Sequence, residues 1–376
     1  MGIRKKIKSN NKIVIVGAGP TGCYLGQILE AKGFDPLLIE EHKEIGRPVH
    51  CAGLVGEKVF KEAKIPVSSR GILNTINGAT IHLGDEAFNI RKDNVAYVVD
   101  REIFDKNLGK DLNILLETKF IGLEKENGRY VIETDKGEIS ADIVIGADGA
   151  SSMVREFVVG KSQSSQLKGV QFRMAFKPAQ KDLVEVYIKR PYFYWIIPES
   201  ERVIRVGVIS QNPYQDLQSF VKRQKINGEI IEKFAGTVPL NYYKALSREK
   251  VFLVGDSAAQ TKPLTYGGIY MGMRGAEILA ECIIEKKFSN YSSLWMQKFG
   301  RELKVPLKAR RIFQELSDKD VKRIFSFARK NIPVIERKGD FEHHSALIWE
   351  LLRNPDNPRE LTAILFKILK ANLRSN

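Results

Sequence analysis

Two glycine-containing segments near opposite ends of the sequence have the residue types and spacing that bind a nucleotide cofactor. In the first, Gly17, Gly19 and Gly22 follow the apolar run 13–16 with the spacing G-x-G-x-x-G. The first glycine permits a tight turn, the second lets the backbone approach a pyrophosphate, and the third lets the next helix pack closely. Glu40 follows the next apolar run, where an acidic side chain binds a ribose hydroxyl. This order predicts a dinucleotide site.

The second segment begins with an apolar run that leads directly into Gly255-Asp256. Pro263 and the pair Gly267-Gly268 follow, and a helical pattern begins after them. The early glycine loop alone indicates only some dinucleotide. The two segments together indicate FAD, bound along its whole length by one discontinuous domain.

Two more segments lie between these loops. Arg101 marks a change from a strand pattern to a helical one, and Asp148-Gly149 follows another apolar run. An Asp-Gly pair after a strand is also an ordinary turn, and that interpretation stays open. In their order, the four segments resemble the FAD proteins built like para-hydroxybenzoate hydroxylase, over roughly residues 10–290. The cofactor-binding residues implied by the resemblances described here and below are Gly17, Gly19, Pro20, Thr21, Gly22, Glu40, Glu41, Arg47, Cys51, Ala52, Arg101, Phe120, Asp148, Gly149, Asp256, Pro263, Gly267, Gly268 and Ile269.

A finer resemblance is carried by GRPVHCAG at 46–53 and PYFYWIIPES at 191–200. Both resemble the geranylgeranyl reductase family, and most of all its archaeal digeranylgeranylglycerophospholipid reductases. Members of the family saturate isoprenoid double bonds in archaeal lipids, chlorophyll side chains or quinone tails. The sequence departs from the family pattern by Tyr194 in place of a glycine and by an isoleucine in place of a phenylalanine. These departures concern the width of the cavity near the flavin.

The aromatic segment is expected to line a cavity for a prenyl chain, because aromatic side chains give large apolar area with little polar surface. They are also common in ordinary half-buried strands, and that alternative stays open. The substrate-binding residues that the resemblance implies are Phe193, Tyr194, Trp195, Pro198 and Tyr266.

Cys51 is the candidate catalytic residue, because the family carries a cysteine near the flavin in a Pro-x-x-Cys segment, here 48–51. Gating of substrate, proton donation and a transient disulfide are the roles open to it. The alternative is simple packing, since free cysteine is usually a small buried apolar residue. No metal-ligand spacing surrounds it, and we expect no metal.

Reduced flavin offers a hydride, and an isolated alkene also needs a proton on the neighbouring carbon. The protein supplies a dry cavity, orientation and a proton source. The sequence therefore predicts an FAD-dependent reductase of isoprenoid C=C bonds in archaeal membrane lipids. The alternatives are an FAD-dependent monooxygenase of the same fold and a reductase of a prenylquinone tail. A ferredoxin-like one-electron donor is the family expectation.

The chain of 376 residues has a formal net charge of +15 and three cysteines. The cysteine content argues against a disulfide scaffold, and we expect a cytoplasmic protein because neither a signal peptide nor a membrane span is apparent. The charge suits an anionic lipid surface or the ordinary surface of a thermophile. Residues 361–374 have the pattern of a basic amphipathic helix, which either touches the inner membrane face or docks on the core. We expect no nucleic-acid partner and a monomer.

The fold class expected is α/β, with a Rossmann-like, three-layer FAD/NAD(P)-binding domain, an inserted antiparallel sheet for substrate, and a helical C-terminal region. The FAD-binding domain is expected to be discontinuous, over residues 10–70, 95–160 and 250–290. Residues 71–94 and 165–247 are assigned to the substrate sheet, because they alternate short strands with turn signals. Residues 291–376 read as helical.

Overall fold

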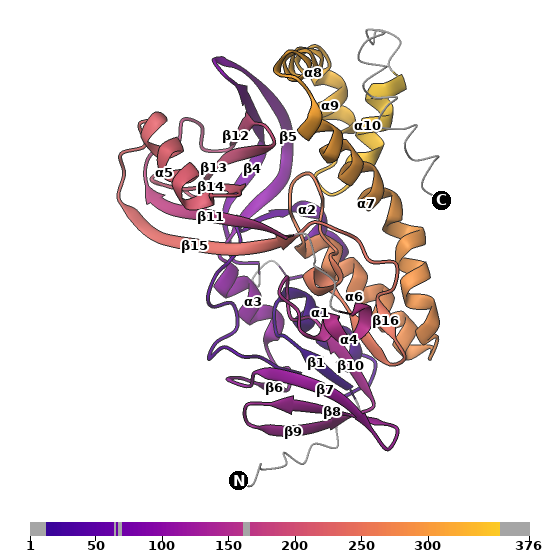
Figure 1. Ribbon diagram of the computed structural model, residues 1–376. Helices are drawn as coiled ribbons and strands as arrows, with labels where there is room; N and C mark the ends of the chain where they lie inside the picture. The colour runs from indigo at the N-terminus through magenta and orange to yellow at the C-terminus, as the bar shows by residue number, and fades with distance from the viewer. Residues whose placement is uncertain (1–12, 64, 67–69, 161–165, 354–376) are drawn as a thin grey trace.

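The computed structural model describes residues 13–63, 65–66, 70–160 and 166–353. In this part of the chain three sheets are arranged along one axis, and a group of C-terminal helices lies beside the upper sheet (Figure 1). A six-stranded sheet and a three-stranded sheet form the lower half, and an eight-stranded sheet forms the upper half. The expected α/β class with a helical C-terminal region is confirmed.

The six-stranded sheet is parallel except at one edge, where β16 is antiparallel to β17. Its central strand β1 pairs with β10 and β2, with Val14 opposite Val144 and Leu37. All residues of β1 and β2 are buried, as expected for strands covered on both faces. In sheet order its strands are β16 (Ser247–Arg248), β17 (Val251–Leu253), β10 (Ile143–Gly146), β1 (Ile13–Val16), β2 (Pro36–Ile39) and β6 (Ile114–Leu115).

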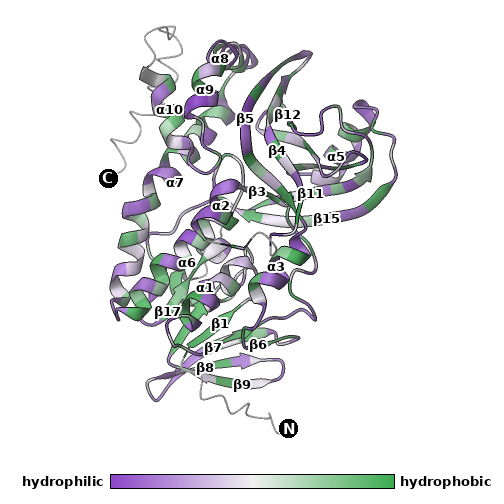
Figure 2. Ribbon diagram, turned by 180° about the vertical axis from the view of Figure 1, so that it is seen from behind, coloured by the Kyte–Doolittle hydropathy of each residue, from purple (hydrophilic) through white to green (hydrophobic). Residues whose placement is uncertain are grey.

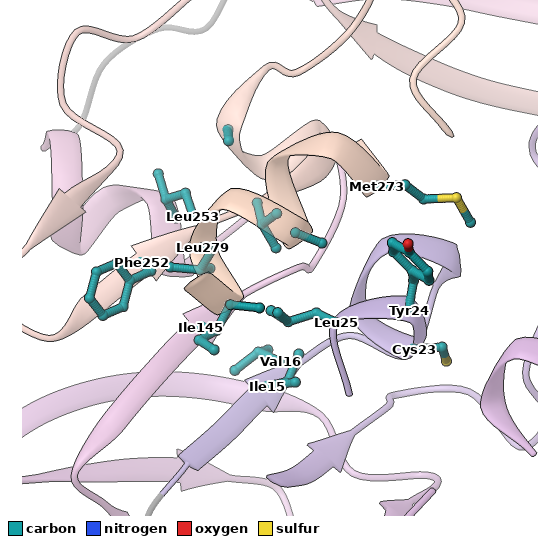
Figure 3. Packing of buried hydrophobic residues seen from close by; sticks show 14 of the residues in the cluster. Ile15, Val16, Cys23, Tyr24, Leu25, Ile145, Phe252, Leu253, Met273 and Leu279 are labelled. Atoms are coloured by element: carbon teal, nitrogen blue, oxygen red, sulfur yellow. The ribbon is translucent and has the colours of Figure 1, made fainter. Parts of the chain in front are cut away.

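Helices that pack on this sheet and strands of the three-stranded sheet complete the largest hydrophobic core. Leu25 of one helix, Leu279 of another and Ile145 of the sheet belong to the same buried cluster (Figure 3). The helices and short helical turns of this half are α1 (Pro20–Glu30), α2 (Glu57–Glu62), α3 (Arg101–Gly109), α4 (Val154–Val159), η2 (Gly255–Ala258), α6 (Ile269–Ile284) and η3 (Phe288–Asn290).

The eight-stranded sheet is antiparallel except where β12 pairs with β4 in parallel. The sheet combines strands from two separate parts of the chain, residues 54–99 and 166–239. Helix α5 (Pro213–Arg223) packs on one of its faces. In sheet order its strands are β15 (Ile230–Pro239), β11 (Gln166–Ala175), β14 (Val203–Ser210), β13 (Tyr192–Pro198), β12 (Val184–Lys189), β4 (Ile72–Leu83), β5 (Glu86–Val99) and β3 (Leu54–Gly56).

Two strand segments expected within the cofactor part lie in this upper sheet. Strand β3 and the end of β5 pair with each other, with Leu54 opposite Val98. The long hairpin β4–β5 therefore continues past residue 94, because its ladder extends to Val99. In Figure 2, β1 of the lower sheet is hydrophobic along its length, whereas much of β5 is hydrophilic.

A three-stranded antiparallel sheet lies at the bottom of the molecule, and its elements are β7 (Phe120–Glu126), β8 (Arg129–Thr134) and β9 (Gly137–Ala141). The C-terminal region is helical, and α7 runs along the side of the molecule from the lower half to the upper half (Figure 1). Its helices are α7 (Tyr291–Glu315), α8 (Asp318–Lys330), α9 (Ile332–Lys338) and α10 (His344–Arg353). The amphipathic segment 361–374 lies outside the described residues.

None of the helices in the described part of the chain has the length and apolar character needed to cross a membrane.

Candidate functional site

The early glycine loop is shaped by backbone contacts that exclude side chains. Gly17 has φ +100°, and a Cβ there would lie 2.5 Å from the carbonyl oxygen of Ala147. A Cβ at Gly22 would lie 2.2 Å from the carbonyl oxygen of Gly17. Gly19, in contrast, has no heavy atom within 4 Å of that position. The loop is thus tightly packed on its inner side and open where a pyrophosphate approaches.

Helix α1 begins directly behind this opening. Gly19 is its N-cap and provides no side-chain cap, and Pro20 occupies the first turn. The first N–H groups of such a helix lack intrahelical partners and carry the positive end of its dipole. They are the natural ligands of a phosphate. Thr21 faces the second loop, since a Cβ at Gly272 would lie 2.3 Å from its Oγ1.

Glu40 lies at the edge of the loop. Its carboxylate accepts the N–H of Ala18 at 2.9 Å and the N–H of His42 at 3.1 Å. The neighbouring Glu41 is exposed and lies 3.9 Å from Lys119 Nζ. The structure therefore brings Glu40, but not Glu41, to the glycine loop.

Arg101 links the predicted catalytic cysteine to the second loop. Its guanidinium donates to Asp105 at 3.0 Å and 2.7 Å and also interacts with the Cys51 thiol. Burial lowers the pKa of Arg101, but the nearby Asp105 and Cys51 outweigh it, so the pKa is raised and the charge is permanent. Cys51 Sγ also accepts the N–H of Gly53 at 3.3 Å. The thiol therefore faces a fixed positive charge.

Asp256 lies in η2 on the other side of Arg101. Burial raises the pKa of its carboxyl to about 6, and the positive charge of Arg101 lowers it only in part. A Cβ at Gly268 would lie 2.5 Å from Asp256 Oδ1, so this position needs a glycine. Gly268 is the N-cap of α6, which begins at Ile269. Arg101, Asp256 and Gly268 thus lie together, as the resemblance requires of a ribitol site.

Asp148 also serves the local fold. Its Oδ2 accepts the N–H groups of Met153 at 2.9 Å and Val154 at 3.2 Å, at the start of α4. Its Oδ1 is buried and has no hydrogen-bond partner within the described ranges. Gly149 has φ +74° and open space beside it. The turn interpretation accounts for one oxygen of Asp148, and the other stays available to a ligand.

The Cys51 loop is held by an ion-pair cluster that the sequence did not predict. Glu199 accepts from Arg205 at 2.8 Å and from Arg173 at 2.6–2.9 Å, and its side chain is 5% exposed. Arg205 Nη1 in turn donates to the carbonyl oxygens of Ala52 at 2.9 Å and Val99 at 3.1 Å. The upper sheet therefore fixes the backbone next to Cys51. The only sequence signal for this cluster is the presence of charged residues, such as Glu199 and Arg205, in and beside otherwise apolar strands.

The aromatic segment is divided between the two faces of the sheet, because successive strand residues point in opposite directions. Phe193 and Trp195 are half-buried, and a Cβ at Gly207 would lie 2.4 Å from the indole of Trp195. Tyr194 is buried on the other face, where its ring stacks on Phe220 of α5 at 4.2 Å. The structure thus separates Tyr194 from its two neighbours.

Tyr266 contacts the same face as Phe193. Their rings stack with centroids 5.4 Å apart and an interplanar angle of 9°. Tyr266 has φ +64°, and its hydroxyl accepts a hydrogen bond from Arg310 of α7. Burial raises the pKa of this phenol, and Arg310 offsets part of the rise. The loop before Gly267 therefore reaches the aromatic strand.

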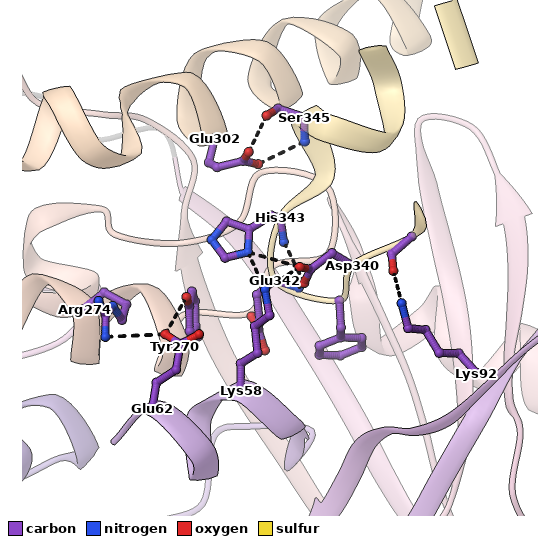
Figure 4. Close-up of polar contacts among 12 residues, drawn as sticks. Lys58, Glu62, Lys92, Tyr270, Arg274, Glu302, Asp340, Glu342, His343 and Ser345 are labelled. Atoms are coloured by element: carbon purple, nitrogen blue, oxygen red, sulfur yellow. Dashed lines mark hydrogen bonds and ion pairs between the residues drawn. The ribbon is translucent and has the colours of Figure 1, made fainter. Parts of the chain in front are cut away.

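The segment between α9 and α10, which includes Asp340 and His343 (Figure 4), contacts the second loop through Lys262. Lys262 Nζ donates to Glu342 Oε2 at 2.7 Å, and both side chains are almost fully buried. Phe341 packs against the same small hydrophobic cluster as Trp195, and Lys58 donates to Asp340 at 2.5 Å. These C-terminal residues carry no motif, so sequence reasoning missed them.

The remaining predicted residues lie apart or serve packing. Arg47 is exposed and forms an ion pair with Glu102 at 2.6 Å. Phe120 is buried in the main core, and Pro263 and Pro198 are also buried. No contact within the described residues brings Arg47 or Phe120 to Asp256.

These residues fit FAD on three structural grounds: the open Gly19, the uncapped start of α1, and the Asp256 carboxylate beside Arg101. The phosphates would lie at α1, a ribose at Glu40 and the ribitol at Asp256. Bound FAD supplies hydride-transfer chemistry. The chain itself supplies the Arg101 guanidinium beside Cys51 and the stacked rings of Phe193 and Tyr266.

The comparisons with known proteins agree with this geometry. The FAD binding domain family matches residues 123–286, and the NAD(P)-binding Rossmann-like domain family matches residues 15–60. FAD is therefore the cofactor, and the early glycine loop belongs to the Rossmann-like part of the chain.

Two curated relatives and one solved structure are similar over most of the chain. An uncharacterised protein of Methanocaldococcus jannaschii is 31% identical over 93% of this chain and 96% of its own. Digeranylgeranylglycerophospholipid reductase 1 of Methanococcoides burtonii is 30% identical, over 84% of this chain and 86% of its own. A geranylgeranyl bacteriochlorophyll reductase-like protein from Thermoplasma acidophilum has the same fold, with a TM-score of 0.78 at 22% identity, over 94% of this chain and 98% of its own. With the FAD site described above, these similarities show that the chain belongs to the geranylgeranyl reductase family of FAD-dependent oxidoreductases.

Proposed function

We propose that this protein is an FAD-dependent reductase that saturates the isoprenoid C=C bonds of geranylgeranyl groups in archaeal membrane lipids. The observation that carries the proposal is the 30% identity, over 84% of the chain, to a digeranylgeranylglycerophospholipid reductase. The Arg101 guanidinium beside Cys51 and the stacked rings of Phe193 and Tyr266 support it.

The chain's own residues have distinct parts in this proposal. Arg101 and Asp256 hold and orient the cofactor from one side, while Phe193 and Trp195 hold the apolar prenyl chain and exclude water. Cys51 supports turnover from its position beside the Arg101 guanidinium. Tyr194 contributes through the packing of its strand, because it lies on the face that α5 covers.

We also propose a one-electron donor such as a ferredoxin, a monomeric state, and a cytoplasmic protein with peripheral contact to the inner membrane face. The net charge of +15 supports the membrane contact, since the negative surface potential of a bilayer attracts basic proteins. Nucleic acid is not a partner in this proposal.

The decisive experiment incubates the FAD-loaded protein anaerobically with dithionite and digeranylgeranylglyceryl phosphate. We expect mass spectrometry to show a gain of two hydrogens for each double bond, and no gain when FAD is omitted. Unchanged lipid in the presence of reduced flavin contradicts the proposal. Incorporation of oxygen in air would instead favour the monooxygenase alternative.

The Cys51 part is tested separately with Cys51→Ser. This variant is expected to bind FAD as the wild type does and to lose most of the reduction rate. Full reduction at the wild-type rate would assign Cys51 to packing.

A further inference from the structure

Arg310 is an unusual residue within the described part of the chain. It lies on the face of α7 that also carries Leu303 and Leu307, and it is only 6% exposed. Its Nη1 donates to the Tyr266 hydroxyl, but its Nη2 is buried and has no hydrogen-bond partner among the described residues. Burying a charged group without a partner is costly. A structure that retains such a group points to a partner of opposite charge.

The other buried cations of the described chain are satisfied. Arg205 has Glu199, and Lys262 has Glu342. Arg155 has no carboxylate, but it donates to the carbonyl oxygens of Ala150 at 2.9 Å and Ser257 at 3.4 Å. Buried cations in this fold are thus normally matched by acceptors. Among these buried cations of the described chain, only Arg310 has a buried nitrogen, Nη2, without a hydrogen-bond partner.

Tyr266 adds a second donor at the same place. Arg310 has no acceptor atom, so the Tyr266 oxygen accepts and its own O–H hydrogen points elsewhere. Tyr266 is half-buried and adopts a left-handed backbone conformation at φ +64°, which is strained for a non-glycine residue. A glycine would avoid this strain. The retained phenol and the Arg310 guanidinium together present two donors beside one positive charge.

The charge around this pair is positive as well. Residues 303–314 contain basic side chains and no Asp or Glu. Lys304 and Lys308 form no ion pair within the described ranges, and neither does Arg310. A neutral carbonyl would satisfy hydrogen bonds but leave this charge uncompensated. A phosphate oxygen satisfies both, because guanidinium–phosphate hydrogen bonds are charge-assisted.

We propose that Arg310 and Tyr266 bind the phosphate group of the lipid substrate. The inference rests on the proposed function, which supplies the lipid, and it adds which end of that lipid the chain recognises and where. Tyr266 stacks on Phe193, so a phosphate held here leads its first prenyl carbons onto the aromatic face. The same chemistry fits a free phosphate ion, and the test separates the two.

The test measures dissociation constants on oxidised, FAD-loaded protein without reductant, so that no turnover occurs. The probes are digeranylgeranylglyceryl phosphate and the same lipid without phosphate, with inorganic phosphate as a third. We expect the wild type to bind the phosphate-bearing lipid about tenfold more tightly, or more, than the phosphate-free lipid. In Arg310→Met the two constants should agree within about twofold, because the phosphate loses its charged partner.

Arg311→Met is the matched control, since it removes the same charge from the next, exposed residue of α7. It should keep the wild-type preference. Tyr266→Phe keeps the Arg310 charge and removes the hydroxyl, which is one donor to the phosphate and the acceptor of the Arg310 hydrogen bond. It should reduce the preference in part, and it decides the question if Arg310→Met does not fold. An unchanged preference in Arg310→Met, or in Tyr266→Phe when it alone folds, overturns the inference.

A free-ion site gives a different pattern, in which the wild type binds both lipids equally and inorganic phosphate binds in an Arg310-dependent manner. That result also overturns the inference. The proposed function is judged apart from it: if both lipids are reduced under dithionite without any preference, the reductase stands and the phosphate site fails.

Discussion

The two large sheets position their functional residues by different means. In the parallel sheet the positions are set by backbone contacts at glycines, such as Gly22 against the carbonyl of Gly17. In the eight-stranded sheet they are set by side chains, chiefly the buried carboxylate of Glu199 between Arg173 and Arg205. The close glycine contacts leave no space for an added side-chain atom, whereas the buried ion pairs require that each charge keeps its partner. Substitutions of opposite kinds should therefore damage the two halves.

The largest effect is expected from Gly22→Val. Its side chain would meet backbone at 2.2 Å, which cannot yield as a flexible side chain does, so we expect no folded FAD-loaded protein. Gly19→Ala is the matched control, because no protein atom lies within 4 Å of its Cβ position. It should keep the cofactor-free fold and weaken FAD binding. The absorbance of bound flavin measures FAD binding, and the melting temperature measures the stability of the fold. A Gly22→Val variant that binds FAD and melts as the wild type does would refute the backbone argument.

Glu199→Leu should come next. It leaves the buried Arg205 without its carboxylate, which is expected to cost about 3–5 kcal/mol of unfolding free energy. The comparison is Glu102→Gln, which removes the surface ion pairs to Arg47 and Lys106 and should cost less than about 1 kcal/mol. Urea unfolding of both variants measures the difference. Equal losses would show that the cluster does not hold the upper sheet.

Phe193→Ala and Tyr194→Ala separate the two faces of one strand. Tyr194 is buried and stacked on Phe220, so its loss should cost about 3 kcal/mol of stability. Because Phe193 is only half-buried, Phe193→Ala should cost less stability and should instead raise the KM for the lipid. Chemical denaturation and steady-state kinetics distinguish these outcomes. A reversed result would place the prenyl chain on the α5 side of the sheet.

The smallest effect is a pH dependence of the cofactor-free protein. Burial raises the pKa of Asp256 to about 6 in the folded state, above the ordinary value of about 3.9 in the unfolded state. The folded state therefore binds this proton more tightly, and stability should fall as the pH rises from about 4 to about 6. Asp256→Asn should remove this part of the slope. Thermal unfolding across that range measures it, and an unchanged slope would rule out Asp256 as the source.

The parallel half was largely predictable from the sequence. Gly17, Gly19 and Gly22 report backbone geometry directly, and the continuous apolar strands that bracket them indicate burial on both faces. FAD followed from combining this loop with Gly255-Asp256, and the FAD binding domain match confirms that cofactor. Local patterns suffice where the chain's own backbone makes the site.

The upper half was predictable as an antiparallel sheet but not in its details. The segment 193–195 was assigned to one cavity, although strand alternation places Tyr194 on the far face. Arg205, Glu342 and Arg310 were missed because each acts on a residue far away in the sequence. Pairings between distant segments leave no periodicity, so only the tertiary structure could reveal them.

The pairing of Lys262 with Glu342 has a consequence for biosynthesis. The loop that holds the flavin is translated eighty residues before the carboxylate that neutralises its buried lysine. During synthesis on the ribosome this ion pair cannot form until Glu342 has emerged. Until then the lysine that is buried in the finished fold carries a charge with no carboxylate beside it.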